Sequence, residues 1–479
     1  MHDRCESSGG FAMPDLGFDP ALVQRLDRPG PRYTSYPTAD RFNDSFTAKH
    51  YAVHARRRHL GGQHRGLSLY VHVPFCRTVC FYCACNKVVT GDRTRAIPYL
   101  QHLERELEMQ SELYEGGGRR VDQLHWGGGS PTFLTLAQMR RLMKSVRGNF
   151  TLAEDHAGDF AIEVDPRFTR ESTVAGLRAI GFNRLSLGLQ DFDPVVQQKV
   201  NRIQSLEETA AVVRAGREEG YKSINVDLIY GLPAQTAQTF DTTLSKVIDL
   251  GPDRIALYNY AHLPHLFKPQ RRISAADLPG AVERLDILQH AVRRFGDAGY
   301  RYIGMDHFAR PDDELSVAQV QGRLRRNFMG YTPHPDADII GVGVSAISSV
   351  GASYSQNVHR VEAYYESIDG GELPVERGIE LDPDDLLRRT IIHGLMCHFM
   401  LYVPSIEQAY LIDFDSYFAR ELEELRGLEA AGLLTIEPPG QPEWITVTPR
   451  GRFLVRNLCM VFDRHLRDRP VDGRYSKAV

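Results

Sequence analysis

The chain has 479 residues, of which 42% are hydrophobic and 25% are charged, and its formal net charge is −4. A chain of this length can form one large domain with a smaller one, or two to three domains of ordinary size. The composition lacks the strong basic field of a nucleic-acid-binding protein, and it lacks any apolar stretch long enough to span a bilayer.

Residues 1–60 form a predicted N-terminal extension. The start of the chain lacks the basic segment and apolar core of a secretory signal, so we expect none. Residues 31–42, PRYTSYPTADRF, are rich in Pro and Tyr and should be extended rather than helical. Seven cysteines in so long a chain do not indicate a disulfide framework, and we expect a cytoplasmic protein in a reducing compartment.

Residues 61–365 alternate between predicted strands and predicted helices. The strands are expected at 67–75, 123–126, 159–165, 184–189, 223–230, 254–260 and 302–307. The helices are expected at 97–114, 136–146, 170–180, 206–219, 239–250 and 281–298. Repeated strand–helix units build a parallel sheet, which makes the fold class α/β. A closed or nearly closed barrel is favoured over a doubly wound open sheet, and in both folds ligands bind at the C-terminal ends of the strands.

Residues 366–479 change to a mostly helical pattern. Helices are predicted at 386–400, 417–431 and 451–466, with a short strand at 444–448. This order resembles a winged-helix-like domain. Because the segment shows no concentrated basic face, a helical cap over the barrel is favoured over DNA binding.

Four of the seven cysteines fall within ten residues, directly after the first predicted strand. They are Cys76, Cys80, Cys83 and Cys85, and the first three have the spacing C-x3-C-x2-C. An iron–sulfur cube takes one thiolate on each iron, so three ligands leave one iron open, as in a catalytic site. Zinc, with His72 as a further ligand, is the alternative, but zinc motifs usually combine two separated pairs. Cys85 is poorly placed to bind the same cube and could be a spare buried thiol.

Polar and glycine residues follow other predicted strands. Gly128, Gly129 and Ser130 form a glycine-rich turn that would let a ligand approach the backbone closely, although an ordinary turn remains open. Glu163 and Asp227 lie near the ends of apolar strands, where an unpaired carboxylate would be costly to bury. A salt bridge or a helix cap would explain these carboxylates equally well.

Several blocks of sequence resemble one family. C-x3-C-x2-C after a first strand is typical of the radical S-adenosylmethionine (radical SAM) enzymes. The chain resembles their oxygen-independent coproporphyrinogen III dehydrogenase (oxidase) family from about residue 31 to the final predicted helix. The blocks that carry the resemblance are PRYTSYPTA, LYVHVPFCRTVCFYCACNK, HWGGGSPTFL, EVDPR, GLQDF, NVDLIYGLP, NYAHLP and GMDHFARPDDEL. The resemblance implies a partial (β/α)6-type parallel barrel with extra strands, an N-terminal arm over the active site and a mainly helical C-terminal domain.

The resemblance also implies a cofactor set and its binding residues. A [4Fe-4S] cluster would be held by Cys76, Cys80 and Cys83, and its open iron would bind S-adenosyl-L-methionine and yield a 5′-deoxyadenosyl radical. The residues expected around this first molecule are Tyr70, Gly128, Glu163 and Ile347. The residues expected around a second S-adenosylmethionine are Tyr82, Gly129, Ser130, Gln190, Arg202, Asp227 and Ala261. The role of that second molecule stays open.

The implied reaction is the oxidative decarboxylation of two propionates of coproporphyrinogen III, which gives protoporphyrinogen IX in haem biosynthesis. Cys85 is expected to act near the active site. His72, Asp306 and His307 lie near the ends of predicted strands, where a lone histidine is usually structural, and His72 is kept as a candidate catalytic residue. The substrate carries four propionates, so Arg32 in the arm and Arg310 are expected to hold it at the barrel mouth.

The expected partners follow from the same resemblance. A flavodoxin- or ferredoxin-like protein would supply electrons, and we expect a monomer with no nucleic-acid or membrane partner. The alternatives are a related haem-binding chaperone, which typically lacks the fourth cysteine and the arm, and a zinc-stabilised interaction protein.

Overall fold

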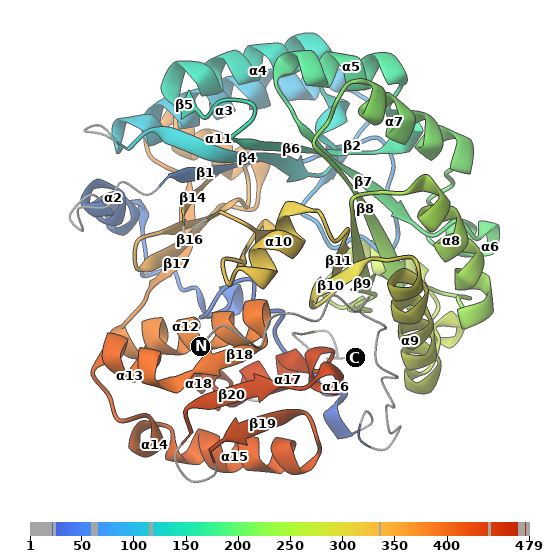
Figure 1. Cartoon of the computed structure of the whole chain (residues 1–479). Helices are drawn as coiled ribbons and strands as arrows, with labels where there is room; N and C mark the ends of the chain where they lie inside the picture. The colour runs from blue at the N-terminus through green and yellow to red at the C-terminus, as the bar shows by residue number, and fades with distance from the viewer. Residues whose placement is uncertain are drawn as a thin grey trace.

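Most of the chain is built on one long, curved sheet whose central strands run parallel (Figure 1). The structure is a computed structural model that describes residues 22, 25–58, 66–114, 118–334, 337–438, 442–467 and 475. The parallel strands are β1 (Leu67–Val73), β4 (Arg120–Gly128), β6 (Asp159–Val164), β7 (Arg184–Gln190), β8 (Ser223–Tyr230), β9 (Arg254–Asn259) and β14 (Asp338–Val342). Their order across the sheet is β9-β8-β7-β6-β4-β1-β14.

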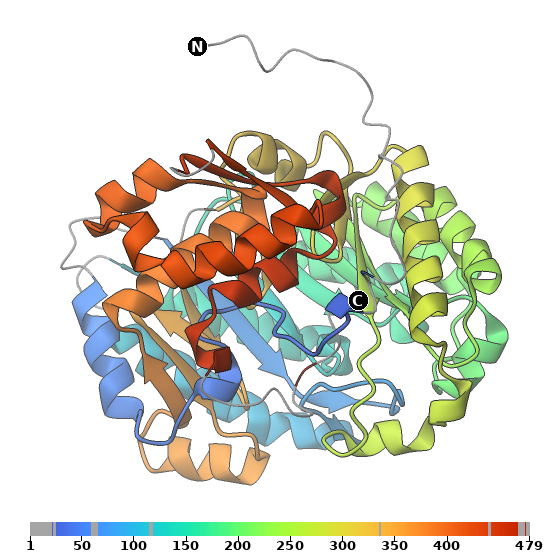
Figure 2. The same ribbon diagram turned by 90° about the horizontal axis from the view of Figure 1, so that it is seen from below.

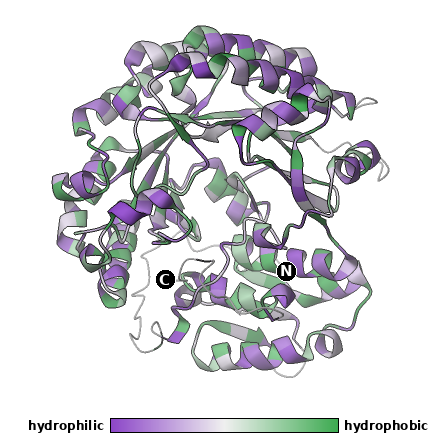
Figure 3. Cartoon of the chain, turned by 180° about the vertical axis from the view of Figure 1, so that it is seen from behind, coloured by the Kyte–Doolittle hydropathy of each residue, from purple (hydrophilic) through white to green (hydrophobic). Residues whose placement is uncertain are grey.

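Each of the parallel strands β1, β4, β6, β7, β8 and β9 is followed by a helix on the outer face of the sheet (Figure 1). These helices are α3 (Ala96–Glu112), α4 (Leu136–Asn149), α5 (Glu171–Ile180), α7 (Leu206–Glu218), α8 (Ala237–Leu250) and α9 (Ala281–Asp297). Ser205 and Glu208 form a capping box at the start of α7. The strands are apolar while hydrophilic residues recur on the outer helices, as expected for a sheet covered by helices (Figure 3). The prediction of a partial (β/α)6-type barrel is therefore confirmed.

Antiparallel strands extend the sheet at both edges. One edge carries β11 (His307–Ala309) and β10 (Arg301–Gly304), and the other carries β15 (Ile347–Val350), β16 (Ser353–Asn357) and β17 (Val375–Glu380). The predicted single strand at 302–307 is wrong, because the chain reverses at Met305, which has a φ of 49°. The predicted boundary after residue 365 falls within α11 (Val361–Asp369), and β17 still belongs to the sheet beyond it.

Short elements complete this part of the chain. A hairpin of β12 (Arg325–Asn327) and β13 (Gly330–Thr332) packs against the barrel interior, since Gln123 Nε2 of β4 donates to Thr332 Oγ1 at 2.7 Å. The remaining helices and strands are α2 (Ala48–Arg57), β2 (Phe75–Cys76), β3 (Val88–Val89), β5 (Thr151–Leu152), α6 (Pro194–Lys199) and α10 (Glu314–Val320). The 3-10 helices are η1 (Ala39–Arg41), η3 (Arg93–Arg95), η4 (Pro131–Phe133), η5 (Pro166–Phe168), η6 (Lys268–Arg272) and η7 (Ala275–Asp277).

The C-terminal region is mainly helical, with a small sheet of order β18-β20-β19. Its elements are α12 (Pro383–His398), β18 (Met400–Tyr402), α13 (Val403–Tyr410), α14 (Phe414–Tyr417), α15 (Ala419–Ala430), β19 (Leu434–Glu437), β20 (Trp444–Val447), α16 (Pro449–Arg452), α17 (Val455–Val461) and α18 (Arg464–Arg467). The predicted final helix at 451–466 is divided into three short helices. None of the helices in the described part of the chain combines the length and the apolar character needed to cross a membrane.

The N-terminal arm runs between the barrel and the C-terminal region (Figure 2). Tyr33 and Tyr36 are fully buried there. The Tyr33 hydroxyl donates to Asp463 at 3.0 Å, and Arg456 Nε donates to the carbonyl of Pro31 at 3.1 Å. Apart from η1, residues 31–42 form no regular helix, as predicted. The arm is thereby held in a position from which its side chains reach the barrel interior.

Candidate active site

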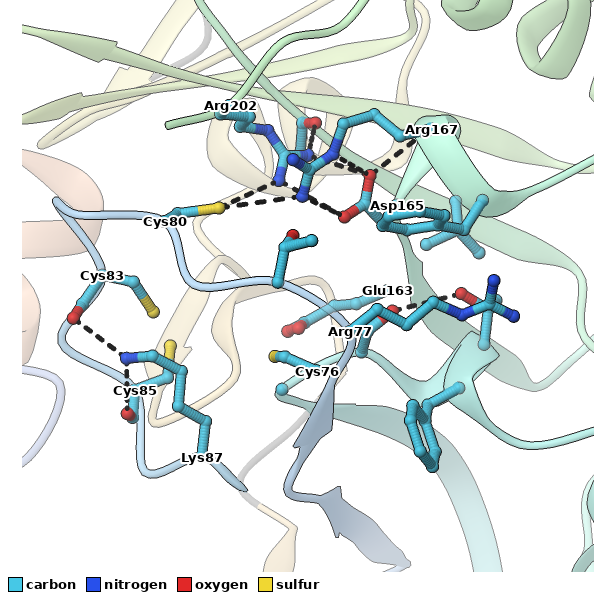
Figure 4. A pocket seen from close by; sticks show the side chains of 18 of the residues that line it. Cys76, Arg77, Cys80, Cys83, Cys85, Lys87, Glu163, Asp165, Arg167 and Arg202 are labelled. Carbon is cyan, nitrogen blue, oxygen red and sulfur yellow. Dashed lines mark hydrogen bonds and ion pairs between the residues drawn. The ribbon is translucent and has the colours of Figure 1, made fainter. Parts of the chain in front are cut away.

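A pocket of about 270 Å³ lies at the C-terminal ends of the parallel strands, and the four clustered cysteines line it (Figure 4). Hydrogen bonds hold the loop that carries them in place along its length. The backbone of Cys76 is paired with β3, and the N–H of Phe81 donates to the carbonyl of Val200 at 2.9 Å. Lys87 Nζ donates to the carbonyls of Cys83 at 3.1 Å and of Cys85 at 3.4 Å. The loop is therefore a fixed support for its sulfur atoms.

The thiols interact with one another. Burial and the neighbouring thiols raise the pKa of Cys76 to about 12. A hydrogen bond from Cys85 lowers the pKa of Cys83 to about 6, while it raises that of Cys85 well above its ordinary value. Several thiolates can coexist in this loop only beside a compensating positive charge. The iron of a cluster would supply such a charge.

The donor set fits an iron–sulfur cube. Cys76, Cys80 and Cys83 face one pocket from a single loop. Within the described residues, no three His, Cys, Asp or Glu side chains converge closely enough to hold one metal ion. A cube takes each thiolate on a different iron, so its ligands stand further apart than those of a single ion. Three thiols that face one pocket from one loop match the three-cysteine donor set of such a cube.

Two arginines and a carboxylate stand beside Cys80. Arg202 Nη1 lies 3.6 Å and Arg167 Nη2 lies 3.7 Å from Cys80 Sγ. Both arginines pair with Asp165, at 3.4 Å and 2.7 Å (Figure 4). Burial alone would raise the pKa of Asp165, but Arg202 and Arg167 hold it below its ordinary value. Asp165 and Arg167 were not predicted as site residues, although both lie in the block EVDPR.

The glycine-rich turn packs closely against the start of the cysteine loop. Gly128 has a φ of +111°, and a Cβ there would lie 2.6 Å from the His72 ring. A Cβ on Gly129 would lie 2.7 Å from the carbonyl oxygen of Pro74. The N–H of Ser130 donates to the carbonyl of Phe75 at 2.9 Å. Glycine is needed at both positions, because a side chain would push the turn away from the loop.

Glu163 lies at the boundary of the pocket. His125 Nε2 is 3.1 Å from Glu163 Oε1, and the N–H of Gly128 donates to Oε2 at 3.3 Å. Tyr70 stacks on His125 with ring centroids 5.9 Å apart. The carboxylate thus retains acceptor capacity toward the pocket that it lines.

His72 is buried below the turn rather than exposed in the pocket. Its Nε2 donates to the carbonyl of Asn86 at 3.0 Å, and its Nδ1 shares a hydrogen bond with the Tyr70 hydroxyl at 3.1 Å. Burial lowers the pKa of His72, so the ring is neutral. Its contacts are those of a residue that positions the cysteine loop.

A second, inner cavity of about 390 Å³ adjoins the cysteine pocket. The two cavities share three lining residues, Glu163, Ser186 and Asp227. Asp227 accepts a hydrogen bond from Asn225 at 2.8 Å, and burial together with the charge of Glu163 raises its pKa to about 7. The inner cavity is lined by four arginines: Arg32, Arg184, Arg254 and Arg326. The same lining carries the carboxylates Asp159, Glu163 and Asp227, so the arginines outnumber the carboxylates by one. A ligand in this cavity would reach the cysteine pocket at one wall.

Most of the predicted site residues meet in these two cavities. The cysteine pocket is lined by Cys76, Cys80, Tyr82, Cys83, Cys85, Gly128, Gly129, Ser130, Glu163, Gln190, Arg202 and Asp227. The inner cavity is lined by Arg32, Tyr70 and His307. Arg32 is paired with Asp306 there and lies over the ring of Tyr258.

Besides His72 and Asp306, three more predicted residues lie outside both linings. Ala261 is linked to the pocket, since Gln270 Nε2 donates to the carbonyls of both Ala261 and Tyr82 at 3.0 Å. Ile347 begins β15, two strands away from Tyr70. The predicted place of Arg310 at the barrel mouth is wrong. Arg310 donates to the carbonyls of Gly251 and Pro252 at the N-terminal end of β9, because β11 runs antiparallel and carries it away from the site.

The chain matches described families and proteins over nearly its whole length. Residues 70–247 match the Radical SAM superfamily, and residues 381–454 match the HemN C-terminal domain. A Pseudomonas aeruginosa protein named oxygen-independent coproporphyrinogen III oxidase is 50% identical over 451 residues, which cover 94% of this chain and 96% of that protein. The Escherichia coli K12 protein of the same name is 46% identical and covers 98% of this chain and all of its own length.

A solved structure is similar across the same span. The coproporphyrinogen III oxidase from Escherichia coli, described as a radical SAM enzyme, superimposes with a TM-score of 0.88 at 46% identity. The match covers 94% of this chain and 99% of that one. The similarity therefore includes the arm, the barrel and the C-terminal region.

Proposed function

This chain belongs to the oxygen-independent coproporphyrinogen III oxidase family of radical SAM enzymes, and from that premise we propose how its residues carry the reaction. The reaction is the oxidative decarboxylation of two propionates of coproporphyrinogen III to vinyl groups, which yields protoporphyrinogen IX in haem biosynthesis. The observation that supports our account is the wall of Glu163, Ser186 and Asp227 that the two cavities share. Cofactors on one side of this wall can act on a substrate held on the other.

The cysteine loop would hold the cofactors. Cys76, Cys80 and Cys83 are the proposed ligands of the [4Fe-4S] cluster, and Cys85 is kept as a thiol beside it. When bound, the cluster and S-adenosylmethionine supply a 5′-deoxyadenosyl radical able to remove hydrogen from the propionate carbon attached to the pyrrole. Lys87 and the arginines beside Cys80 place positive charge around a thiolate-rich group, which stabilises it electrostatically.

We propose two S-adenosylmethionine molecules with separate residues. Glu163 would accept hydrogen bonds from the ribose of the first, beside Tyr70, Gly128 and Ile347. Around the second would stand Tyr82, Gly129, Ser130, Gln190, Arg202, Asp227 and Ala261. In support, Gln190 Oε1 is buried at the pocket wall without a hydrogen-bond partner among the described residues, which suits a donor group on a ligand.

The inner cavity would hold the substrate away from water. Its arginines complement the four propionates of coproporphyrinogen III, and Arg32 is supplied by the arm. The arm packs on the C-terminal region through Tyr33 and Arg456, so both parts help to exclude solvent. Each decarboxylation then releases carbon dioxide within a closed site and passes one electron to a separate acceptor.

Electrons for the cluster would come from a flavodoxin- or ferredoxin-like donor. Arg77, Arg93 and Arg95 are exposed near the cysteine loop and would attract an acidic partner. We propose a monomer in a reducing, cytoplasmic compartment, because the cysteines of the site must stay unoxidised to bind iron.

The experiment for this function is an anaerobic assay of the reconstituted protein with coproporphyrinogen III, S-adenosylmethionine and a chemical reductant. The expected result is protoporphyrinogen IX, with two carbon dioxide molecules released for each product. Tight haem binding without any vinyl product would contradict the oxidase and favour a haem chaperone.

A further inference from the structure

Arg326 is a buried cation at the boundary of two cavities. It lies on β12 and is 4% exposed. It lines the inner cavity and also a neighbouring cavity of about 300 Å³ below α12. Its Nε and Nη1 atoms have no hydrogen-bond partner within the described residues. Buried polar groups are normally paired, so this guanidinium suits a ligand that the chain itself does not provide.

The other arginines of the inner cavity are paired with carboxylates. Arg184 bonds Asp159 at 2.6 Å and also pairs with Glu314. Arg254 bonds Asp313 at 2.9 Å. Arg32 pairs with Asp306, so Arg326 differs from all three in lacking an ion pair within the described residues.

The surroundings hold Arg326 in place without offering it a counter-charge. Its guanidinium lies over the ring of Tyr331, 4.7 Å from the centroid, which supports a cation without neutralising it. His307 also faces the cavity, and burial together with the charge of Arg326 lowers its pKa to about 3. His307 is therefore neutral and offers Arg326 no counter-charge.

The neighbouring cavity adds two further arginines and two histidines, and burial together with the charge of Arg325 lowers the pKa of one of these histidines, His398. Arg325, Arg389, His393 and His398 line it, and Thr34, Asn327, Phe328 and Thr332 line both cavities together with Arg326. An anionic ligand in the inner cavity could extend a carboxylate toward this basic wall.

We propose that Arg326 binds a propionate of coproporphyrinogen III that is not reacting, through a charge-assisted hydrogen bond. This inference rests on the proposed function. Arg326 lines the cavity next to α12, whereas the wall shared with the cysteine pocket carries Glu163 and Asp227. A substrate with four propionates can present one of them to the shared wall while another pairs with Arg326. The guanidinium thereby orients the macrocycle for hydrogen removal.

The test compares wild type with Arg326→Gln and Arg326→Lys in the reconstituted full chain. Loss of a charge-assisted hydrogen bond should weaken binding of the fluorescent probe coproporphyrin III about tenfold or more. The KM for coproporphyrinogen III should rise by a similar factor, and more 5′-deoxyadenosine should form for each vinyl group. Lysine, which keeps the charge but not the planar fork, should recover part of the loss.

Thermal unfolding measurements distinguish a ligand-binding role of Arg326 from a structural role. Arg326→Gln should leave the melting temperature unchanged or raise it, because it removes a buried charge without a partner. Arg184→Gln is the matched control and should lower it, because it leaves Asp159 buried without its arginine. A lower melting temperature for Arg326→Gln, or wild-type probe affinity and KM, would overturn the proposal.

Binding of the probe coproporphyrin III also distinguishes a failure of this inference from a failure of the proposed function. If the wild-type protein forms no vinyl product, the proposed function fails, whatever the variants do. Suppose instead that the wild type is active and that Arg326→Gln binds coproporphyrin III with the affinity of the wild type. In that case only the inference about Arg326 fails.

Discussion

The cysteine pocket and the inner cavity share one wall but are built in different ways. In the cysteine pocket the charged groups are mainly paired with one another, as Arg202 and Arg167 are with Asp165. The inner cavity draws its arginines from the arm, from two barrel strands and from the β12–β13 hairpin, and it leaves Arg326 without a carboxylate within the described residues. The pocket is thus preorganised for a bound cluster and the S-adenosylmethionine beside it, whereas the cavity keeps binding capacity for the substrate.

The largest effect is expected in the cysteine pocket. Replacing Cys76, Cys80 or Cys83 with Ser should prevent assembly of the cluster and abolish turnover, because three thiolates must hold it. Iron and sulfide analysis with electron paramagnetic resonance after anaerobic reconstitution measures this. Cys459→Ser, in α17 and outside the pocket lining, is the control and should retain the cluster. A full cluster in any of the three variants would remove that cysteine from the ligand set.

Cys85→Ser should separate cluster assembly from turnover. Cys85 contacts Cys83 in the pocket but is not one of the proposed ligands, so the variant should keep its cluster signal and lose activity. The measurement is the resonance spectrum of the reduced variant together with anaerobic turnover. A Cys85→Ser protein without a cluster would show that the ligands are misassigned.

A substitution of Arg32 in the arm, at the inner cavity, should have a smaller effect on catalysis. Arg32→Gln leaves Asp306 without its arginine beside the substrate, so kcat/KM for coproporphyrinogen III should fall by roughly tenfold or more. Arg56→Gln makes the same charge change on the exposed face of α2 and should leave kcat/KM near the wild-type value. Equal kcat/KM in both variants would remove the arm from the substrate site.

Asp227, which lies in the shared wall, should make the stability of the folded protein depend modestly on pH. The folded protein raises the pKa of Asp227 to about 7, well above that of an exposed Asp at about 3.9. The unfolded chain therefore loses this proton first as pH rises, and the stability of the ligand-free protein falls between about pH 4 and 7. Asp227→Asn should reduce this fall in unfolding measurements across that range. An unchanged pH profile would contradict the raised pKa.

Glu106 provides a matched control for Asp227. Its pKa is also raised to about 7 by burial, but it accepts hydrogen bonds from Gly343, Asn357 and Tyr364 at 2.7 to 2.8 Å and lines neither cavity. Both Asp227→Asn and Glu106→Gln should reduce the pH dependence of stability. Only Asp227→Asn should weaken binding of S-adenosylmethionine, which equilibrium titration measures.

The sequence predicts the cysteine pocket better than the inner cavity. The cysteines are clustered, and the polar residues follow apolar strands whose C-terminal ends must meet in a parallel sheet. Arg326 lies on a three-residue strand without a usable hydrophobic period, so its place in the cavity depends on tertiary packing alone. Arg310 was misplaced because nothing local shows that the chain reverses at Met305.

The central claim is that cofactors on one side of the shared wall act on a substrate on the other side. Its most direct test is to follow hydrogen transfer from the substrate to 5′-deoxyadenosine. Coproporphyrinogen III carrying deuterium on the propionate carbons attached to the pyrroles would be incubated anaerobically with the reconstituted protein and S-adenosylmethionine. Our account predicts that the 5′-deoxyadenosine formed carries deuterium from the substrate. Vinyl product accompanied by unlabelled 5′-deoxyadenosine, with the deuterium released to water, would contradict it.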